Sequence, residues 1–127
     1  MVISRADWDA LVAHARDEAP NECCGYARMT DGRVDEVFRG VNERNSPYGY
    51  ELDPKSLLAA NDLDDDGFGV AIYHSHPRSA AEPSQTDINL AHYPHWHYVI
   101  VSLAGDPEVR AFTIADGNVT EEDVTVE

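Results

Sequence analysis

Two histidines and an aspartate near the middle of the chain are the residues whose types and spacing could do chemistry. His74 and His76 are one residue apart, directly after the apolar run 69–73, and Asp87 follows in the next segment. Two imidazoles and one carboxylate suit Zn²⁺, which takes nitrogen and oxygen donors at roughly 2.0–2.2 Å. Three protein ligands leave one position open for a water molecule, which is typical of a catalytic zinc. The pattern therefore indicates a hydrolytic metal site.

A strand and a short helix are expected to bring these ligands together. Residues 69–76 read as a strand, in which side chains two residues apart project to the same face, and Pro77 ends it. Ser84 is expected to cap a helix that runs to about His92, with Asp87 in its first turn. Isolated histidines at this spacing are more often ordinary strand-end side chains. The proline, serine and aspartate at fixed offsets favour the metal site instead.

A hydrolytic zinc site also needs a general base, and two carboxylates compete for that role. Glu82 lies in the loop beside the ligands, whereas Glu22 stands near the start of an expected strand over residues 20–29. From spacing alone either could serve. A rigid strand holds a base better than a loop between two prolines, and this favours Glu22.

The rest of the chain predicts one α/β domain over residues 1–127, with a mixed sheet flanked by helices. A second helix is expected to begin at Asp53-Pro54, with Leu57, Leu58, Ala60 and Leu63 on its buried side. Beyond the elements given above, the pattern predicts a helix over 4–19, a hairpin turn at 30–33, and strands over 34–41, 96–103, 108–114 and 119–126.

The composition is strongly acidic. The chain has 24 Asp and Glu against 9 Lys and Arg, for a formal charge of −15, and Lys55 is its only lysine. Such a surface repels nucleic-acid phosphates and anionic membranes, so neither is an expected partner. We hypothesise a halophilic host, because molar salt screens the self-repulsion. No long apolar segment or basic leader occurs, and Cys23 and Cys24 are adjacent, which together predict a cytoplasmic protein.

The segment His74-Ser75-His76-Pro77, followed by Ser84 and Asp87, resembles the signature of the JAMM (MPN-plus) zinc metalloproteases. Further similarity lies upstream in residues 21–25 and downstream in residues 93–103. The resemblance implies a single JAMM/MPN domain built on a curved, mixed β-sheet.

The same resemblance implies a role for each residue of the site. His74, His76 and Asp87 would hold one Zn²⁺ per chain. Glu22 stands where the family carries its catalytic glutamate, which decides between the two carboxylates. Ser84 would donate its hydroxyl to the oxyanion, in addition to capping the helix.

Family members with this complete set are zinc isopeptidases that remove ubiquitin or ubiquitin-like proteins from lysine side chains. With its acidic, lysine-poor surface, the chain is similar to the compact desampylases of haloarchaea, which act on small modifiers ending in Gly-Gly. Such modifiers and their conjugates are the expected partners, and the tail is expected to pair with the stretch Tyr48 to Leu52.

Three alternatives stand beside that function. Relatives of this fold process sulfur-carrier proteins with the same Gly-Gly tail. A non-catalytic binding module would lack metal ligands, and a zinc deaminase would need a Pro-Cys-x-x-Cys motif, which is absent. The oligomeric state, the natural conjugates and the linkage preference cannot be predicted from the sequence.

Overall fold

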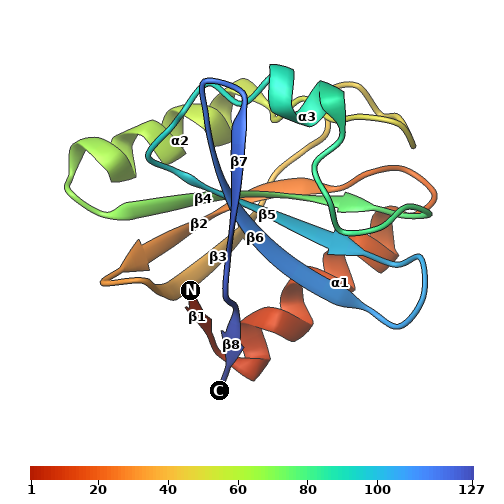
Figure 1. The fold of residues 1–127 in the computed structure, drawn as a ribbon, viewed down its shortest axis with the longest axis horizontal. Coiled ribbons are helices and arrows are strands. Elements are labelled where there is room, and N and C mark those ends of the chain that lie inside the picture. Colours follow the sequence, from red (N-terminus) through yellow and green to blue (C-terminus); the bar gives the residue numbers. More distant parts are fainter.

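The computed structural model describes residues 1–127 and arranges them as one eight-stranded sheet with three helices (Figure 1). None of the three helices combines the length and the apolar character needed to cross a membrane. In chain order the elements are β1 (Val2–Ile3), α1 (Arg5–Glu18), β2 (Cys24–Thr30), β3 (Arg33–Arg39), α2 (Pro54–Asp65), β4 (Gly69–His76), α3 (Gln85–Asn89), β5 (His97–Ser102), β6 (Glu108–Ala115), β7 (Asn118–Glu122) and β8 (Thr125–Val126).

The sheet is mixed and curled. Its strand order is β7-β6-β5-β4-β2-β3-β1-β8, with parallel pairing of β4 with β5 and of β1 with both β3 and β8. β7 and β8 end the strand order at opposite edges, yet only Asp123 and Val124 separate them in the chain, so the sheet must curl (Figure 1). The amino group of Met1 donates to the Asp123 carbonyl at 2.8 Å. This architecture confirms the expected α/β class with a curved, mixed sheet.

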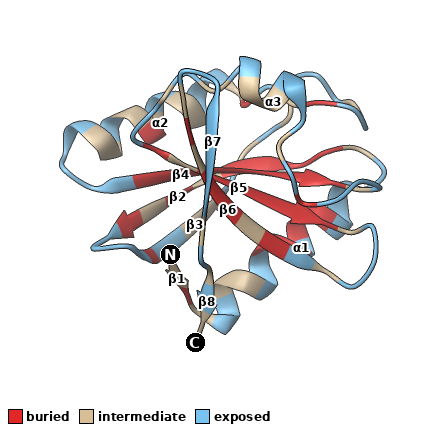
Figure 2. Ribbon diagram, viewed as in Figure 1, coloured by how far each residue is buried: buried red, intermediate tan, exposed pale blue.

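Helices cover both faces of the sheet, with α1 on one side and α2 and α3 on the other (Figure 1). The most deeply buried ribbon is the centre of the sheet (Figure 2). Side chains of β4 alternate between the two cores: Ala71 and Tyr73 join the cluster under α1, whereas Val70 and Ile72 join the cluster under α2. By the same period of two, His74 and His76 belong to the α2 and α3 face.

Several element bounds differ from the sequence expectations. The strand expected over 20–29 begins only at Cys24, because the N–H of Glu22 donates to the Ser46 carbonyl instead of to a neighbouring strand. The helix capped by Ser84 ends at Asn89 and does not reach His92. The strand expected over 119–126 is two strands, β7 and β8, which pair at opposite edges of the sheet.

The prediction of a buried Leu58 on α2 was wrong, since this side chain is 64% exposed. Leu57 and Leu63 are partly buried and Ala60 is fully buried, so Leu58 faces solvent one position away from the buried stripe. The hairpin turn between β2 and β3 is confirmed. Asp31 and Gly32 both adopt positive φ, at 50° and 78°, as a tight hairpin turn of this type requires.

Candidate metal centre

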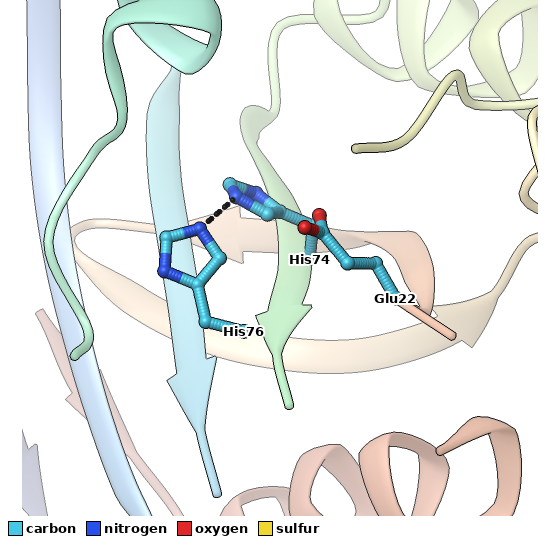
Figure 3. A group of neighbouring side chains, drawn as sticks. All are labelled: Glu22, His74 and His76. Atoms are coloured by element: carbon cyan, nitrogen blue, oxygen red, sulfur yellow. Dashed lines mark hydrogen bonds between the residues drawn. The ribbon is translucent and has the colours of Figure 1, made fainter. Parts of the chain in front are cut away.

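His74 and His76 occupy the end of the central strand β4. Backbone pairing fixes His74 between β2 and β5 and fixes His76 against β5, and both side chains are buried, at 2% and 5% exposed. Their Nε2 atoms lie 3.1 Å apart, on the face that carries α2 and α3 (Figure 3). The predicted common orientation of the two imidazoles is confirmed.

Asp87 reaches the same point from α3. Ser84 and Asp87 form a reciprocal capping box: the Asp87 N–H donates to Ser84 Oγ at 3.1 Å, and the Ser84 N–H donates to Asp87 Oδ2 at 2.9 Å. This cap turns the carboxylate toward β4. Asp87 Oδ2 then lies 3.1 Å from Nε2 of His74 and 3.1 Å from Nε2 of His76.

The three donor atoms thus form a triangle with equal 3.1 Å sides, and this triangle suits a metal ion. Ligands about 2.0–2.1 Å from a tetrahedral Zn²⁺ lie roughly 3.3 Å from one another. The Nδ1 atom of His76 is 2.7 Å from the Ala80 carbonyl, which accepts only if Nδ1 carries the proton. In the neutral imidazole this leaves Nε2 of His76 with the lone pair that a ligand must present. A cation bound by these three atoms would remove the repulsion among them.

The pKa shifts of His74 and Asp87 agree with this interpretation, whereas that of His76 favours its protonated form. Burial lowers the pKa of His74, which keeps its imidazole neutral and able to coordinate. Burial acts to raise the pKa of Asp87, but the two histidines outweigh it and hold that pKa well below its usual range. Burial acts to lower the pKa of His76, but the Asp87 carboxylate and the Ala80 carbonyl outweigh it and raise that pKa.

Glu22 lies beside the two histidines (Figure 3). Glu22, His74 and His76 each offer one donor atom, and these atoms lie within 4.8 Å of one another. Asp87 Oδ2 lies 3.1 Å from both Nε2 atoms, so either carboxylate is near enough to complete a three-donor set with the two histidines. The Glu22 side chain is buried, and its Oε1 has no hydrogen-bond partner in the chain. Burial raises the pKa of Glu22 to about 7.

Of the other candidate residues, Ser84 lies at the cluster, whereas Glu82 and Ser75 point away from it. Glu82, the competing base, is exposed and points to Arg110, 3.5 Å away, outside the cluster. Ser84 Oγ accepts from the Asp87 N–H, and its hydroxyl hydrogen is free to donate elsewhere. Ser75 points away from the metal centre, and its Oγ accepts from the Cys23 N–H at 2.8 Å.

Two features of the centre were missed from the sequence. Tyr50 stacks on His74, with ring centroids 4.3 Å apart and planes at 18°. The Ala80 carbonyl holds Nδ1 of His76. Both contacts come from loops, and a carbonyl carries no signal in residue type. The extended stretch around Tyr50 is the only signal in the sequence, and it predicts an edge for the tail and not a contact with His74.

Comparison with known proteins decides the family. The family profile Prok-JAB, described as prokaryotic homologs of the JAB domain, matches residues 4–115. The chain belongs to this family. The JAMM (MPN-plus) membership expected from the motif is thereby confirmed. The expected class of enzyme, a metalloprotease, is confirmed with it.

Relatives of this JAB domain are known from several organisms. The chain is 42% identical over 136 residues to the "CysO-cysteine peptidase" of Mycobacterium tuberculosis, covering 99% of this chain and 91% of the relative. It is 38% identical over 116 residues to the "Desampylase" of Haloferax volcanii, covering 83% and 82%. The solution structure of protein DSY2949 from Desulfitobacterium hafniense superimposes with a TM-score of 0.82 at 32% identity, covering 100% and 93%. Bacteria and an archaeon both carry relatives, so the haloarchaeal origin stays a prediction.

Proposed function

We propose that this JAB domain is a zinc-dependent peptidase that hydrolyses the bond between the Gly-Gly carboxyl terminus of a ubiquitin-like modifier and an amine. The observation that carries the proposal is the equilateral set of His74, His76 and Asp87 donors, with the Glu22 carboxylate within reach of both histidines. The family membership and the names of the relatives support the same reaction class.

In the proposed mechanism His74, His76 and Asp87 hold one Zn²⁺ per chain. When bound, such an ion would supply Lewis-acid chemistry, which lowers the pKa of water from about 15.7 to about 7. Glu22 accepts a proton as the water oxygen adds to the carbonyl carbon, and returns it to the amine as the C–N bond breaks. Burial raises the pKa of Glu22, which strengthens its carboxylate as a proton acceptor. Ser84 donates its hydroxyl to the developing oxyanion.

The chain also offers a place for the tail of the modifier. The backbone of Glu51 and Asp53 bonds to residues 41–43, but the N–H and C=O groups of Tyr50 and Leu52 have no partner in the chain. These groups form a free edge that can pair with an extended peptide. Diglycine has no side chains, so it can approach the recessed metal closely.

A cavity lies next to this edge. It has a volume of ≈ 280 Å³, and most of its lining residues are apolar, including Leu52, Leu57, Ile72 and Tyr98. The cavity suits apolar side chains of the substrate that precede the diglycine, because the burial of each apolar side chain is favourable. The edge and the cavity together support a peptide substrate with a bare Gly-Gly end.

A second candidate substrate is a sulfur-carrier protein extended at its Gly-Gly end by a cysteine. The observation that favours it is the 42% identity to the mycobacterial relative named CysO-cysteine peptidase, which spans nearly the whole chain. Both substrates share one tail, so the same groove serves either. A purely binding module is disfavoured, because the chain retains the complete set of donor residues. We further propose a cytoplasmic enzyme that has neither nucleic acid nor membranes as partners.

The decisive experiment compares wild type with Glu22→Gln, which keeps the size of the side chain but cannot accept a proton. Both proteins are assayed on a modifier–lysine conjugate and on a modifier extended by one cysteine, and their zinc content is measured. We expect cleavage by the wild type, at least about a hundredfold less by the variant, and equal zinc in both. Equal activity of the two proteins would show that Glu22 has no part in the mechanism. An active wild type without zinc would show that the metal has none. The ratio of the two wild-type rates decides between the substrates.

A further inference from the structure

The backbone of Glu22 makes no bond to the sheet, although its neighbour Cys23 bonds to Ser75 of β4 and the proposed mechanism needs Glu22 in a fixed place. β2 begins at Cys24, two residues later. The backbone of Glu22 bonds instead to the segment after β3: its N–H donates to the Ser46 carbonyl at 2.9 Å, and its C=O accepts from Nδ2 of Asn42 at 3.0 Å. On the side away from Cys23, the position of Glu22 therefore depends on this segment.

The Asn42 side chain uses every hydrogen-bonding position that a primary amide has. Nδ2 donates to the carbonyls of Glu22 and Gly49, both at 3.0 Å. Oδ1 accepts from the N–H groups of Arg44, at 3.1 Å, and Glu51, at 3.0 Å. Two donors and two acceptor positions are thus all occupied, and the partners leave one possible orientation of the amide.

These four bonds connect the backbone of Glu22 to the segment that contacts His74. Gly49 and Glu51, which Asn42 binds, are the two neighbours of Tyr50, and the Tyr50 ring stacks on His74. One amide therefore ties the backbone of the proposed base to the residue that covers a proposed metal ligand.

We infer that Asn42 is a positioning residue, which sets the placement of Glu22 relative to His74. The inference rests on the proposed function. A displacement of about 1 Å at a reacting group can cost about a hundredfold in rate. Losing the amide leaves the Glu22 and Gly49 carbonyls without their donor, so the segment 42–51 and the Glu22 backbone can shift independently.

The test uses two variants and a matched control. Asn42→Ala removes all four bonds, whereas Asn42→Asp keeps the acceptor for the Arg44 and Glu51 amides and loses only the donors. Asn21→Ala is the control, because Nδ2 of Asn21 donates to Oδ1 of Asn45 at 2.9 Å and so links the same two segments from an exposed position. The readouts are kcat, KM, zinc content and backbone amide exchange of the metal-free protein.

We expect kcat to fall at least about tenfold in both Asn42 variants, with zinc content and KM within about twofold of wild type. The Glu22 amide should exchange faster in both. The Glu51 amide should exchange faster only in Asn42→Ala, and Asn21→Ala should match wild type throughout. Unchanged kcat in Asn42→Asp, or a loss of activity matched by a loss of zinc, would overturn the inference. If the wild type cleaves no Gly-Gly conjugate, the proposed function fails, and unchanged exchange at Glu22 would then refute the role of Asn42 separately.

Discussion

The ring of Tyr50 lies nearly parallel to the imidazole of His74, with 4.3 Å between the ring centroids. His74 is a proposed metal ligand, and its Nδ1 is buried without a hydrogen-bond partner. His76 differs, since its Nδ1 is held by the Ala80 carbonyl. The stack therefore orients His74 where a hydrogen bond orients His76.

Replacing Tyr50 tests this difference. Tyr50→Ala removes the stacked ring, so we expect zinc affinity to fall about tenfold or more, as for other groups that orient ligands. Tyr50→Phe keeps the ring and should bind zinc like the wild type. Competition with a chromogenic chelator at fixed pH measures both. A Tyr50→Ala protein with wild-type affinity would show that β4 alone orients His74.

Ser84 has two separable roles, and each has its own readout. Ser84→Ala removes the helix cap, which should cost about 0.5–2 kcal/mol of unfolding free energy. It also removes the proposed oxyanion donor, which should lower kcat about 10²–10³-fold. Ser84→Thr keeps a hydroxyl and should recover much of the unfolding free energy and much of kcat. If kcat falls only as far as zinc content falls, the serine acts through Asp87 and not on the oxyanion.

Removal of the metal should abolish activity without unfolding the chain. β4 pairs with β2 from Gly69 to His74 and with β5 from Ala71 to His76, so the two histidines are held by backbone bonds. We expect the far-UV circular dichroism of chelator-treated protein to match that of the zinc-loaded protein. The melting temperature should fall, because zinc at 100 times its Kd adds about 2.7 kcal/mol. Unfolding on chelation would contradict this prediction.

His14 predicts an acid-sensitive core. It is 3% exposed, its Nδ1 lies 2.6 Å from the Tyr73 hydroxyl, and burial lowers its pKa to about 4 from an ordinary 6.5. Between pH 4 and pH 6.5, His14 is protonated in the unfolded chain but neutral in the folded chain. The stability is therefore complete above pH 6.5 and falls toward pH 4, by roughly 1 kcal/mol per unit from this residue.

Urea unfolding at pH 7 and pH 5 measures the effect, with His14→Gln as the comparison. Glutamine also accepts a hydrogen bond but does not titrate in this range. The wild type should lose more stability than the variant between the two pH values. Equal losses would mean that other groups cause the acid sensitivity.

The net charge of −15 predicts a dependence on salt. Electrostatic repulsion is screened as the Debye length falls from about 10 Å at 0.1 M to about 3 Å at 1 M. We expect the melting temperature to rise in molar KCl and less so for a variant with several exposed carboxylates changed to amides. Greater stability in low salt would contradict the proposed halophilic origin.

Much of the fold follows from local patterns, and the parts that do not are tertiary. The run 69–76, the Asp31-Gly32 turn and the Asp53-Pro54 helix start each carry their signal within a few residues. β1 has two residues and is paired only because β3 and β8 lie beside it. The division between β7 and β8 results from the curl of the sheet, which no short pattern contains.

The same distinction applies to the site. His74, His76, Ser84 and Asp87 lie within one strand, loop and helix, so their spacing predicts their convergence. Glu22 is distant in sequence and was placed by resemblance to a family. Nothing in the sequence distinguishes Asn42, because it is a lone polar residue after a strand and its four partners are backbone groups.

The central place of β4 in the sheet has a consequence for how such domains diverge. Because the strand that carries both histidines is secured by its neighbours and not by the metal, a single substitution in the proposed site, at Glu22, Asp87 or a histidine, should abolish cleavage and leave the proposed peptide groove intact. Gene duplication followed by one point substitution would then turn a peptidase into a protein that binds Gly-Gly tails without cleaving them. A Glu22→Gln protein is accordingly a trap for capturing the natural conjugates from cell extracts.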